Sequence, residues 1–396
     1  MTDLILRLAI ISCITLNTAF AATAPSMPIP SPPQLSAKSW VLMDAASGDV
    51  ITSHEPQKRL PPASLTKLMT VYLATTEIQG GRLKPDDRVV VSEHAWRTQG
   101  SRMFLDPRSN VSVHDLLRGI VIDSGNDASV ALAEHIAGSE DVFAGMMNVT
   151  AKRLGLQNTH FMNPTGLPDP EHYSSAMDMA TLARAIINDE SDYYALYKEK
   201  YLTWNGIRQP NRNLLLWRDK SVDGLKTGHT EAAGFCMVTS AIRNGRRLIT
   251  AVLGSSSMEN RAADTQKLLT YGYRFSETRT YAKAAHELAR PQLWKGEEHT
   301  LPVGVLDNLS LTLPKNGFRH VQTRMQFEEP IVAPVTKGDI VGKLTLLEGD
   351  HALVTRPLVA LETEAAGPWW WRAWDTVKLF IQNLCKDAFD AQSSTT

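Results

Sequence analysis

One stretch of this chain commits it to an antiparallel sheet. Residues 234–254 read GFCMVTSAIRNGRRLITAVLG, in which two runs rich in β-forming residues flank Asn244-Gly245. This dipeptide is the preferred pair for a type I′ turn, whose twist matches that of the strands it joins. The sequence therefore predicts a long two-stranded hairpin, and the other elements of the fold must be arranged around it.

Both strand and helix patterns precede the hairpin. Residues 39–55 predict two strands joined at a Ser47-Gly48-Asp49 turn, and residues 64–78 carry apolar side chains at helical spacing. Residues 112–137 predict two more helices separated by the polar stretch DSGN. We therefore expect an α/β domain over residues 37–285, with a central antiparallel sheet covered by helices.

The pattern changes after residue 285. Short alternating runs such as LSLTLP, IVGKLTLLE and RPLVALET end in turn residues, which predicts a small β-sandwich domain over residues 286–365. This segment contains no plausible catalytic set. The net charge of -1 gives no electrostatic reason for a nucleic-acid partner, and the sequence does not indicate an oligomeric state.

The N-terminus predicts export. Arg7, the apolar run 8–18 and the small-x-small pattern at 19–21 are typical of a signal peptide, so we expect residues 1–21 to be removed. A retained anchor is the alternative, and Ile11-Ser12-Cys13 lies too early for a good lipoprotein site. Residues 22–36, rich in Pro and Ser, predict an extended tether. The remaining cysteines, Cys236 and Cys385, indicate no disulfide framework.

The C-terminal segment 366–396 predicts an amphipathic helix. Its apolar face would comprise Trp370, Trp374, Val377, Ile381, Leu384 and Ala388. Polar residues interrupt the segment too often for a membrane span, whereas tryptophans favour the membrane interface. We therefore expect residues 369–389 to lie on a membrane surface. Packing on the protein's own core, or a dimer seam, would use the same pattern.

A hydroxyl and an amine occupy one face of the helix predicted after Pro61 and Pro62. Ser64 and Lys67 are three residues apart, so their side chains are neighbours in a helix. A partly buried lysine, or one near a second cation, loses basicity and can take the proton of a serine hydroxyl. This spacing suits serine acyl transfer. The alternative is that Ser64 only caps the helix and Lys67 is a solvated surface lysine.

Two further motifs follow in order. Ser124-Gly125-Asn126 supplies a second hydroxyl for proton relay and an amide for a peptide backbone, although such triplets also occur in plain turns. Lys226-Thr227-Gly228 precedes the hairpin, where an extended peptide could pair with a strand edge and Gly228 would allow close approach. We expect Lys226 to depress the pKa of Lys67.

With these three motifs the chain resembles the D-alanyl-D-alanine carboxypeptidases, which are low-molecular-weight penicillin-binding proteins with a β-lactamase/transpeptidase-like fold. Further blocks such as VLMDAASGDVI, LGLQNTHFMNPTGLP and GLKTGHTEAAGFCMV support the resemblance, which runs from about residue 37 to the C-terminus. It implies Ser64 as the acylated nucleophile, Lys67 as its base and Ser124 as a proton relay. It also implies a set of substrate-binding residues: Asn126, Lys226, Thr227, Gly228, His229 and Arg261.

The resemblance implies removal of the terminal D-alanine from peptidoglycan stem pentapeptides, acylation by β-lactams, and a location on the periplasmic face of the inner membrane. No metal or other cofactor is expected, since H-E-x-x-H is absent and the histidines lack ligand spacing. A class A β-lactamase would need an added glutamate, and residues 155–175 offer only Glu171. A D,D-endopeptidase is a closer alternative, and a non-catalytic scaffold would not need the complete set.

Overall fold

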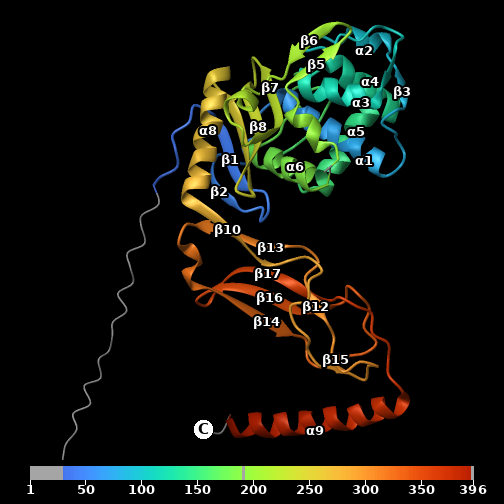
Figure 1. The fold of residues 1–396 in the computed structure, drawn as a ribbon, viewed down its shortest axis with the longest axis vertical. Helices are drawn as coiled ribbons and strands as arrows, with labels where there is room; N and C mark the ends of the chain where they lie inside the picture. The colour runs from blue at the N-terminus through green and yellow to red at the C-terminus, as the bar shows by residue number, and fades with distance from the viewer. Residues whose placement is uncertain (1–29, 190–191, 394–396) are drawn as a thin grey trace, which may run out of the picture. The chain divides into compact units, whose positions relative to one another are not determined.

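The computed structural model describes residues 30–189 and 192–393, and a five-stranded antiparallel sheet organises its first domain (Figure 1). The strand order is β2-β1-β9-β8-β7. The strands are β1 (Ser39–Asp44), β2 (Val50–His54), β7 (Val222–Thr230), β8 (Gly234–Arg243) and β9 (Arg246–Ser255). Since β7 lies at one edge, its outer side is free to face other parts of the domain.

The predicted hairpin is confirmed in strands β8 and β9. Arg243 pairs with Arg246, and the two turn residues Asn244 and Gly245 have φ angles of 51° and 76°. Positive φ at both central positions is what a type I′ turn requires. Strand β1 pairs with β9 and with β2, so the two strands expected within residues 39–55 are also present.

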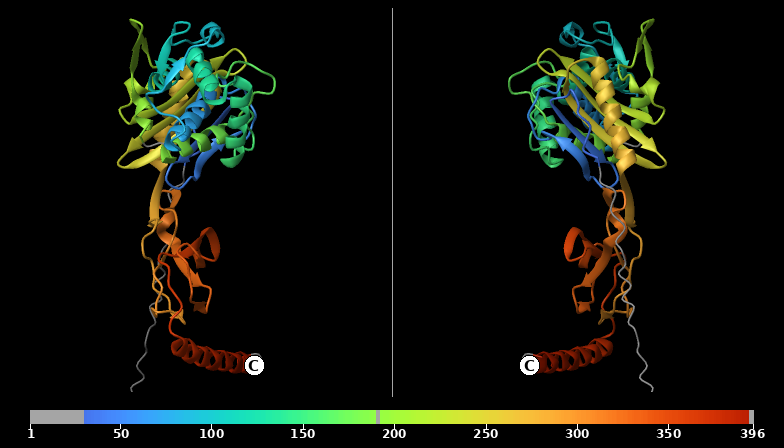
Figure 2. Two further views of the ribbon diagram at one scale, coloured as in Figure 1. Left: turned by 90° about the vertical axis from the view of Figure 1, so that its right-hand side faces the viewer. Right: turned by 90° about the vertical axis from the view of Figure 1, so that its left-hand side faces the viewer.

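The sheet is buried on both faces because its strands alternate between two cores. On one face, Leu42, Leu248 and Val252 pack with Leu268 and Leu269 of helix α8 (Met258–Phe275). Figure 2 shows the long helix α8 along that face, and Leu215 and Leu216 of the short helix α7 (Leu215–Arg218) belong to the same core. The opposite core is larger and contains the helix that begins at Lys67.

The remaining helices and short strands of this domain follow in chain order: η1 (Ala63–Thr66), α1 (Lys67–Gln79), β3 (Arg88–Val90), α2 (Glu93–Arg97), β4 (Asn110–Ser112), α3 (Val113–Arg118), η2 (Gly119–Asp123), α4 (Asn126–Ala137), α5 (Glu140–Arg153), α6 (Ala176–Asp189), η3 (Tyr194–Lys198), β5 (Tyr201–Trp204), β6 (Ile207–Pro210) and α7 (Leu215–Arg218). The η1 and η3 segments are 3₁₀ turns, and η2 is a π turn. Strands β5 and β6 form a separate hairpin near α7.

A second part of the chain is rich in β-strands, and its first strand, β10, comes before the boundary predicted at residue 285 because it pairs with β13. Its elements are β10 (Ser276–Ala282), β11 (Leu293–Trp294), β12 (Val303–Gly304), β13 (Leu309–Pro314), η4 (Gly317–His320), β14 (Val321–Phe327), β15 (Ile331–Val332), β16 (Ile340–Glu348) and β17 (His351–Ala360). The main sheet has the order β12-β17-β16-β14, and β10 pairs with β13. Alternate apolar residues such as Leu344, Leu346 and Leu358 form the core between them.

The last helix, α9 (Trp369–Ser393), is amphipathic. Trp370, Trp374, Val377 and Ile381 of the predicted apolar face are all exposed, whereas the side chains of Leu384 and Ala388 lie outside the described residues. In the part of the chain that the structure describes, no helix is apolar enough over its length to cross a membrane. The proposed signal peptide, residues 1–21, also lies outside the described residues.

Candidate active site

The first motif lies where a 3₁₀ turn passes into helix α1. Residues 63–66 form the 3₁₀ turn, so Ser64 precedes the α-helix rather than occupying its first turn, as the sequence had suggested. Ala63 has a φ of 50°, and this bend presents the half-buried Ser64 to the pocket. Thr66 is fixed by a 2.8 Å hydrogen bond between its Oγ1 and Nε2 of the buried His172.

Lys67 is buried and has three oxygen neighbours. Its Nζ donates to Ser64 Oγ at 3.0 Å, to Asn126 Oδ1 at 2.7 Å and to the carbonyl oxygen of Thr165 at 2.6 Å. Burial, and to a lesser degree the positive charge of Arg212, lower the pKa of Lys67 to about 7. An amine with such a pKa is partly neutral at physiological pH, so it can accept a proton from the adjacent hydroxyl.

The second motif follows a π turn. Ser124 adopts the left-handed conformation with a φ of 61°, and its Oγ has no hydrogen-bond partner among the described residues. The side chain of Asn126 is committed at both ends, because its Nδ2 also donates to the carbonyl oxygen of Gln99 at 2.6 Å. The structure thus brings Asn126 to Lys67, and it leaves the Ser124 hydroxyl open toward the pocket that both serines line.

Asp127 fixes the chain segment that lies next to this motif. Its fully buried carboxylate accepts hydrogen bonds from the backbone N–H groups of Met103, Phe104 and Leu105 at 2.8, 2.9 and 3.1 Å. The residue thereby fixes the segment that also carries Gly100 and Ser101, which line the pocket. Its place directly after Asn126 was visible in the sequence, but its backbone partners were not.

The third motif lies on the edge strand β7. Lys226 and Thr227 are buried, and Lys226 Nζ donates to the carbonyl oxygen of Thr227 at 2.9 Å. Burial lowers the pKa of Lys226 well below its ordinary value, and the charge of Lys67 adds to that effect. A Cβ atom at Gly228 would lie 3.0 Å from the backbone nitrogen of Ser64, so glycine lets the strand meet the first motif.

His229 and Arg261 complete the predicted set. The exposed ring of His229 stacks on Phe235, with ring centroids 4.1 Å apart. Arg261 on α8 is buried, and its Nη1 donates to the carbonyl oxygens of Gly228 and Cys236 at 3.4 and 3.3 Å. Burial lowers the pKa of Arg261 to about 10. Its position beneath the edge strand excludes a plain surface arginine.

These motifs line one cavity of about 890 Å³. From the predicted site it contains Ser64, Ser124, Thr227, Gly228, His229 and Arg261. Lys67 and Asn126 do not line the cavity. They lie behind Ser64, to which Lys67 is hydrogen-bonded directly and Asn126 by way of Lys67. Three chain segments that are far apart in sequence therefore present a nucleophile, a second hydroxyl and a strand edge to the same space, and the base lies behind the nucleophile, as acyl transfer requires.

Sequence reasoning missed two charged residues in this region. Arg212 lines the cavity, and it is the largest charged cause of the lowered pKa of Lys67, a role that had been expected of Lys226. Asp123 is buried next to Ser124, and its Oδ2 accepts a 3.2 Å hydrogen bond from Gln209 Nε2. Burial raises the pKa of Asp123 to about 7. No periodic pattern marks either residue, because both act through tertiary contacts.

Within residues 30–189 and 192–393, no group of three or more His, Cys, Asp or Glu side chains is placed to hold a metal ion. Glu171, the candidate for a β-lactamase glutamate, is exposed and does not line the cavity.

Two family models match the chain. One, described as D-alanyl-D-alanine carboxypeptidase, matches residues 26–257, and the other, described as penicillin-binding protein 5, C-terminal domain, matches residues 276–366. Among curated proteins, D-alanyl-D-alanine carboxypeptidase DacC of Escherichia coli (strain K12) is 41% identical over 355 residues, which cover 88% of this chain and 89% of DacC. DacA of Haemophilus influenzae is 38% identical over 386 residues, which cover 96% of this chain and 98% of DacA.

Solved structures agree with these matches. Penicillin binding protein 5 from Haemophilus influenzae superimposes with a TM-score of 0.79 and 38% identity, covering 85% of this chain and 99% of the other. Penicillin binding protein 6B from Escherichia coli gives a TM-score of 0.69 and 39% identity, with coverages of 85% and 99%. The expected fold class, with its antiparallel central sheet and its C-terminal β domain, is confirmed.

Proposed function

Because this chain belongs to the D-alanyl-D-alanine carboxypeptidase family, we propose that it is a serine-type carboxypeptidase that removes the terminal D-alanine from peptidoglycan stem pentapeptides. The observation that carries this proposal is the contact between Ser64 Oγ and Lys67 Nζ at 3.0 Å, in a cavity that also holds an edge strand. A buried amine with a pKa of about 7 is the base that a serine nucleophile needs.

Acylation begins with proton transfer from Ser64 to the neutral amine of Lys67. Ser64 Oγ attacks the carbonyl carbon between the last two D-alanines, and the carbonyl oxygen becomes an oxyanion. The backbone N–H groups of Ser64 and His229 stabilise that oxyanion. Removal of one such donor costs about 3 kcal/mol of transition-state stabilisation in comparable enzymes.

Breakdown of the tetrahedral intermediate releases D-alanine. The leaving amine receives the proton from Lys67 by way of the Ser124 hydroxyl, which has no competing partner among the residues that the structure describes. Water then attacks the acyl-enzyme ester, which frees the shortened peptide and restores Ser64. No redox or group-transfer reagent is needed for this sequence.

Positive charges select the carboxylate at the end of the substrate. The charges of Arg212 and Arg261 both lower the pKa of Lys226, so these three cations lie near one another, and no Asp or Glu is among the described residues that line the cavity. A terminal carboxylate near Thr227 therefore gains from charge-assisted hydrogen bonds, which are about twice as strong as neutral ones. The free edge of β7 supplies backbone pairing for the extended peptide.

Two alternatives are less well supported. A β-lactamase needs rapid deacylation, and the exposed Glu171 is not placed to activate water in the cavity. A scaffold that has lost its activity would not retain a buried lysine aimed at the serine, since burial of Lys67 costs stability that such a protein has no reason to bear.

Intact-mass spectrometry after incubation with penicillin tests the nucleophile. We expect one penicilloyl adduct on the mature protein and none on Ser64→Ala, together with D-alanine release from diacetyl-Lys-D-Ala-D-Ala by the wild type alone. Thr376→Ala, which removes an exposed hydroxyl on α9, is the folded control that should still be acylated. An adduct that persists in Ser64→Ala would refute the assignment.

The same proposal includes export and attachment to the periplasmic face of the inner membrane through residues 369–389. The exposed side chains of Trp369, Trp370 and Trp374 support it. Indole rings that face water in the free protein gain free energy when they move into the membrane interface. Two contacts join the start of α9 to the β domain. The backbone N–H of Lys295 donates to the carboxylate of Asp375 at 2.8 Å, and the rings of His299 and Trp371 lie with their centroids 5.2 Å apart. Sedimentation with anionic lipid vesicles should retain the full chain and release one truncated after residue 368.

A further inference from the structure

A loop of residues 161–172 lies against the 3₁₀ turn of residues 63–66, which carries Ser64. We refer to these two segments as the covering loop and the catalytic turn. The covering loop is closed at its base, because His160 and Tyr173 form an antiparallel bridge with backbone hydrogen bonds of 2.9 and 3.1 Å. The contacts that the loop makes between these two ends therefore decide where its backbone lies.

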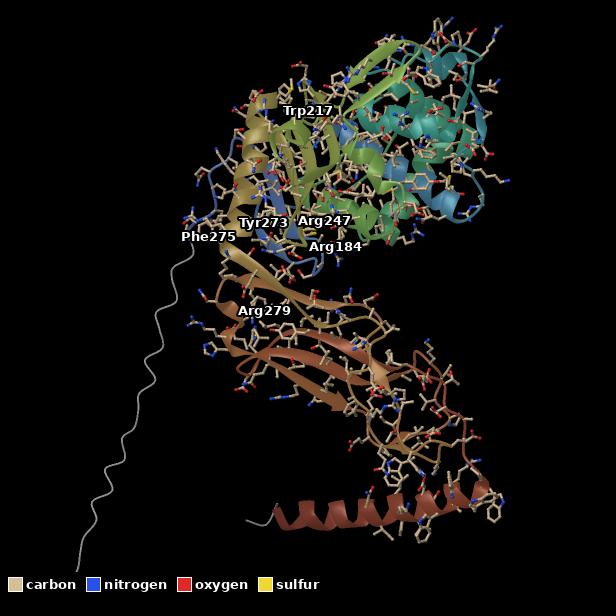
Figure 3. The ribbon with its side chains drawn as sticks, in the orientation of Figure 1. Arg184, Trp217, Arg247, Tyr273, Phe275 and Arg279 are labelled. Atoms are coloured by element: carbon tan, nitrogen blue, oxygen red, sulfur yellow. The ribbon has the colours of Figure 1, made fainter. Side chains whose placement is uncertain are left out.

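The helix that follows the covering loop is attached to the central sheet. Helix α6 begins at Ala176, shortly after the bridge at the base of the loop. Arg184 on this helix, labelled in Figure 3, donates from Nε to the carbonyl oxygen of Ala45, the residue after β1, at 2.8 Å. The buried side chains of Met179 and Leu182 join the larger core. The base of the loop is therefore fixed, and its remaining freedom lies over the catalytic turn.

The covering loop supplies one of the oxygens that surround the catalytic base. A Cβ atom at Gly166, whose φ is 83°, would overlap with a backbone oxygen of the catalytic turn, so only glycine lets the two segments approach this closely. Thr70 Oγ1 donates to the carbonyl oxygen of Pro164 at 2.7 Å. Lys67 Nζ donates to the carbonyl oxygen of Thr165 at 2.6 Å. The position of this last oxygen depends on how the loop is held.

The ring of His172 joins the covering loop to the catalytic turn. Its Nδ1 accepts a hydrogen bond from the backbone N–H of Met162 at 3.2 Å, so the proton of the neutral ring lies on Nε2. Nε2 therefore donates to Thr66 Oγ1 at 2.8 Å. The ring also meets Phe161 edge to face, with centroids 5.7 Å apart, which fixes its plane. One buried side chain thus holds both segments.

This arrangement requires an uncharged ring. An imidazolium would carry protons on both nitrogens, and its Nδ1–H would face the N–H of Met162 without an acceptor. Burial lowers the pKa of His172 to about 4, against the opposing charge of Asp169. The ring is therefore neutral in the pH range where Lys67, with a pKa of about 7, takes up and releases its proton. The link between loop and turn persists while the base changes its charge.

Thr66 gives up its ordinary role for this contact. It is the N-cap residue of α1, where a threonine hydroxyl commonly accepts a hydrogen bond from the first turn of the helix. Among the described residues, its side chain makes no such cap bond, and its hydroxyl bonds to His172 instead. The hydroxyl is thus used to fix the residue directly before Lys67 rather than to stabilise the helix.

We propose that His172 is a positioning residue of the acyl-transfer site, because it holds the covering loop against Thr66. The loop in turn keeps the carbonyl oxygen of Thr165 on the amine of Lys67. This inference rests on the proposed function and adds to it a residue that does not touch the reacting atoms. If the loop moves away, Nζ loses an acceptor that orients it toward Ser64, and proton transfer from the serine becomes slower.

Acylation kinetics of the mature protein test the inference. Rapid mixing with a fluorescent penicillin separates the dissociation constant of the first complex from the rate constant of acylation, and the amplitude after long incubation counts the competent sites. We expect His172→Ala to lower the rate constant per competent site about a hundredfold, the scale of a small misplacement of reacting groups, with an unchanged dissociation constant. A residue that only stabilised the fold would change the number of competent sites and not the rate of each.

Further variants separate the two ends of the ring. His172→Gln reaches the position of Nε2 and should recover most of the rate, whereas His172→Asn reaches only the position of Nδ1 and should remain slow. Thr66→Val removes the hydroxyl at similar size, so it should match His172→Ala and serves if that variant folds poorly. His160→Ala is the matched control and should keep the wild-type rate, because this ring bonds to the carbonyl oxygen of Glu171 at 2.8 Å at the base of the same loop.

Two outcomes would overturn the inference while leaving the proposed function intact. One is a wild-type rate constant per competent site in both His172→Ala and Thr66→Val. The other is an equal loss in His160→Ala and His172→Ala. A wild type that is not acylated by penicillin and does not release D-alanine would instead refute the proposed function, and this inference with it.

Discussion

Replacement of Asp127 by Asn should destabilise the catalytic domain more than any conservative change at its surface. In the wild type, Oδ1 accepts from Met103 N and Ala128 N, and Oδ2 accepts from Phe104 N and Leu105 N, all within 3.1 Å. The amide of asparagine has one oxygen, so two of these four buried donors would face its NH₂ group without an acceptor.

The magnitude follows from that count. Each buried donor left without a partner costs about 1–3 kcal/mol, and the two surviving bonds each lose about 1 kcal/mol when their acceptor becomes neutral. Relief from burying a charge offsets part of the sum. We expect a net loss of about 4 kcal/mol in the free energy of unfolding, which for a domain of this size lowers Tm by roughly 8–16 °C.

Urea unfolding measures this loss, with acylation by a fluorescent penicillin reporting the folded catalytic domain. Asp106→Asn is the matched control, because the exposed Asp106 belongs to the same segment and has one side-chain partner, Asn205. Its effect should stay within about 0.5 kcal/mol. If Asp127→Asn proved as stable as this control, the view that the carboxylate holds residues 103–105 in place would be refuted.

Three further predictions concern charge and the membrane. Arg212→Gln removes a cation that lowers the pKa of Lys67, so the acid limb of the acylation rate against pH should move to higher pH; an unmoved limb would contradict the assigned role of Arg212. Asp123 binds its proton more tightly when folded, so its contribution to stability is present below about pH 4 and is lost as pH rises through about 7. Thermal unfolding of Asp123→Asn should therefore show a smaller decline between pH 5 and 8 than the wild type, and an equal decline would count against it. Trp370→Glu should weaken vesicle binding without changing D-alanine release in solution, whereas equal binding would argue against the exposed face of α9 as the membrane contact.

Local patterns predicted most of the fold but not the start of the first helix. The Asn244-Gly245 hairpin and the amphipathic C-terminal helix follow from rules that act over a few residues, and both are present. The 3₁₀ turn at 63–66 was missed because it depends on distant partners. Thr66 is hydrogen-bonded to His172, and strand β7 passes close to the turn at Gly228. Both partners are far away in the sequence, so local patterns do not predict these contacts.

The site divides in the same way. Ser64 and Lys67 were identified by their spacing, since the chemistry itself requires them to be near each other. The carbonyl oxygen of Thr165 also accepts a hydrogen bond from Lys67, and the guanidinium of Arg212 lowers its pKa. A backbone carbonyl can belong to any residue type, and a single arginine forms no repeating pattern, so the sequence marks neither group. Such groups become visible only when the chain is folded.

The three oxygens around Lys67 differ in one respect that bears on catalysis. Asn126 Oδ1 and the Thr165 carbonyl can only accept hydrogen bonds, whereas the Ser64 hydroxyl can accept or donate. An ammonium donates to all three, and a neutral amine donates to the first two while its lone pair receives the hydroxyl proton. The same heavy-atom positions therefore serve both protonation states. The proton can pass between nitrogen and oxygen while the surrounding framework stays still, so little of the activation barrier arises from rearranging the protein.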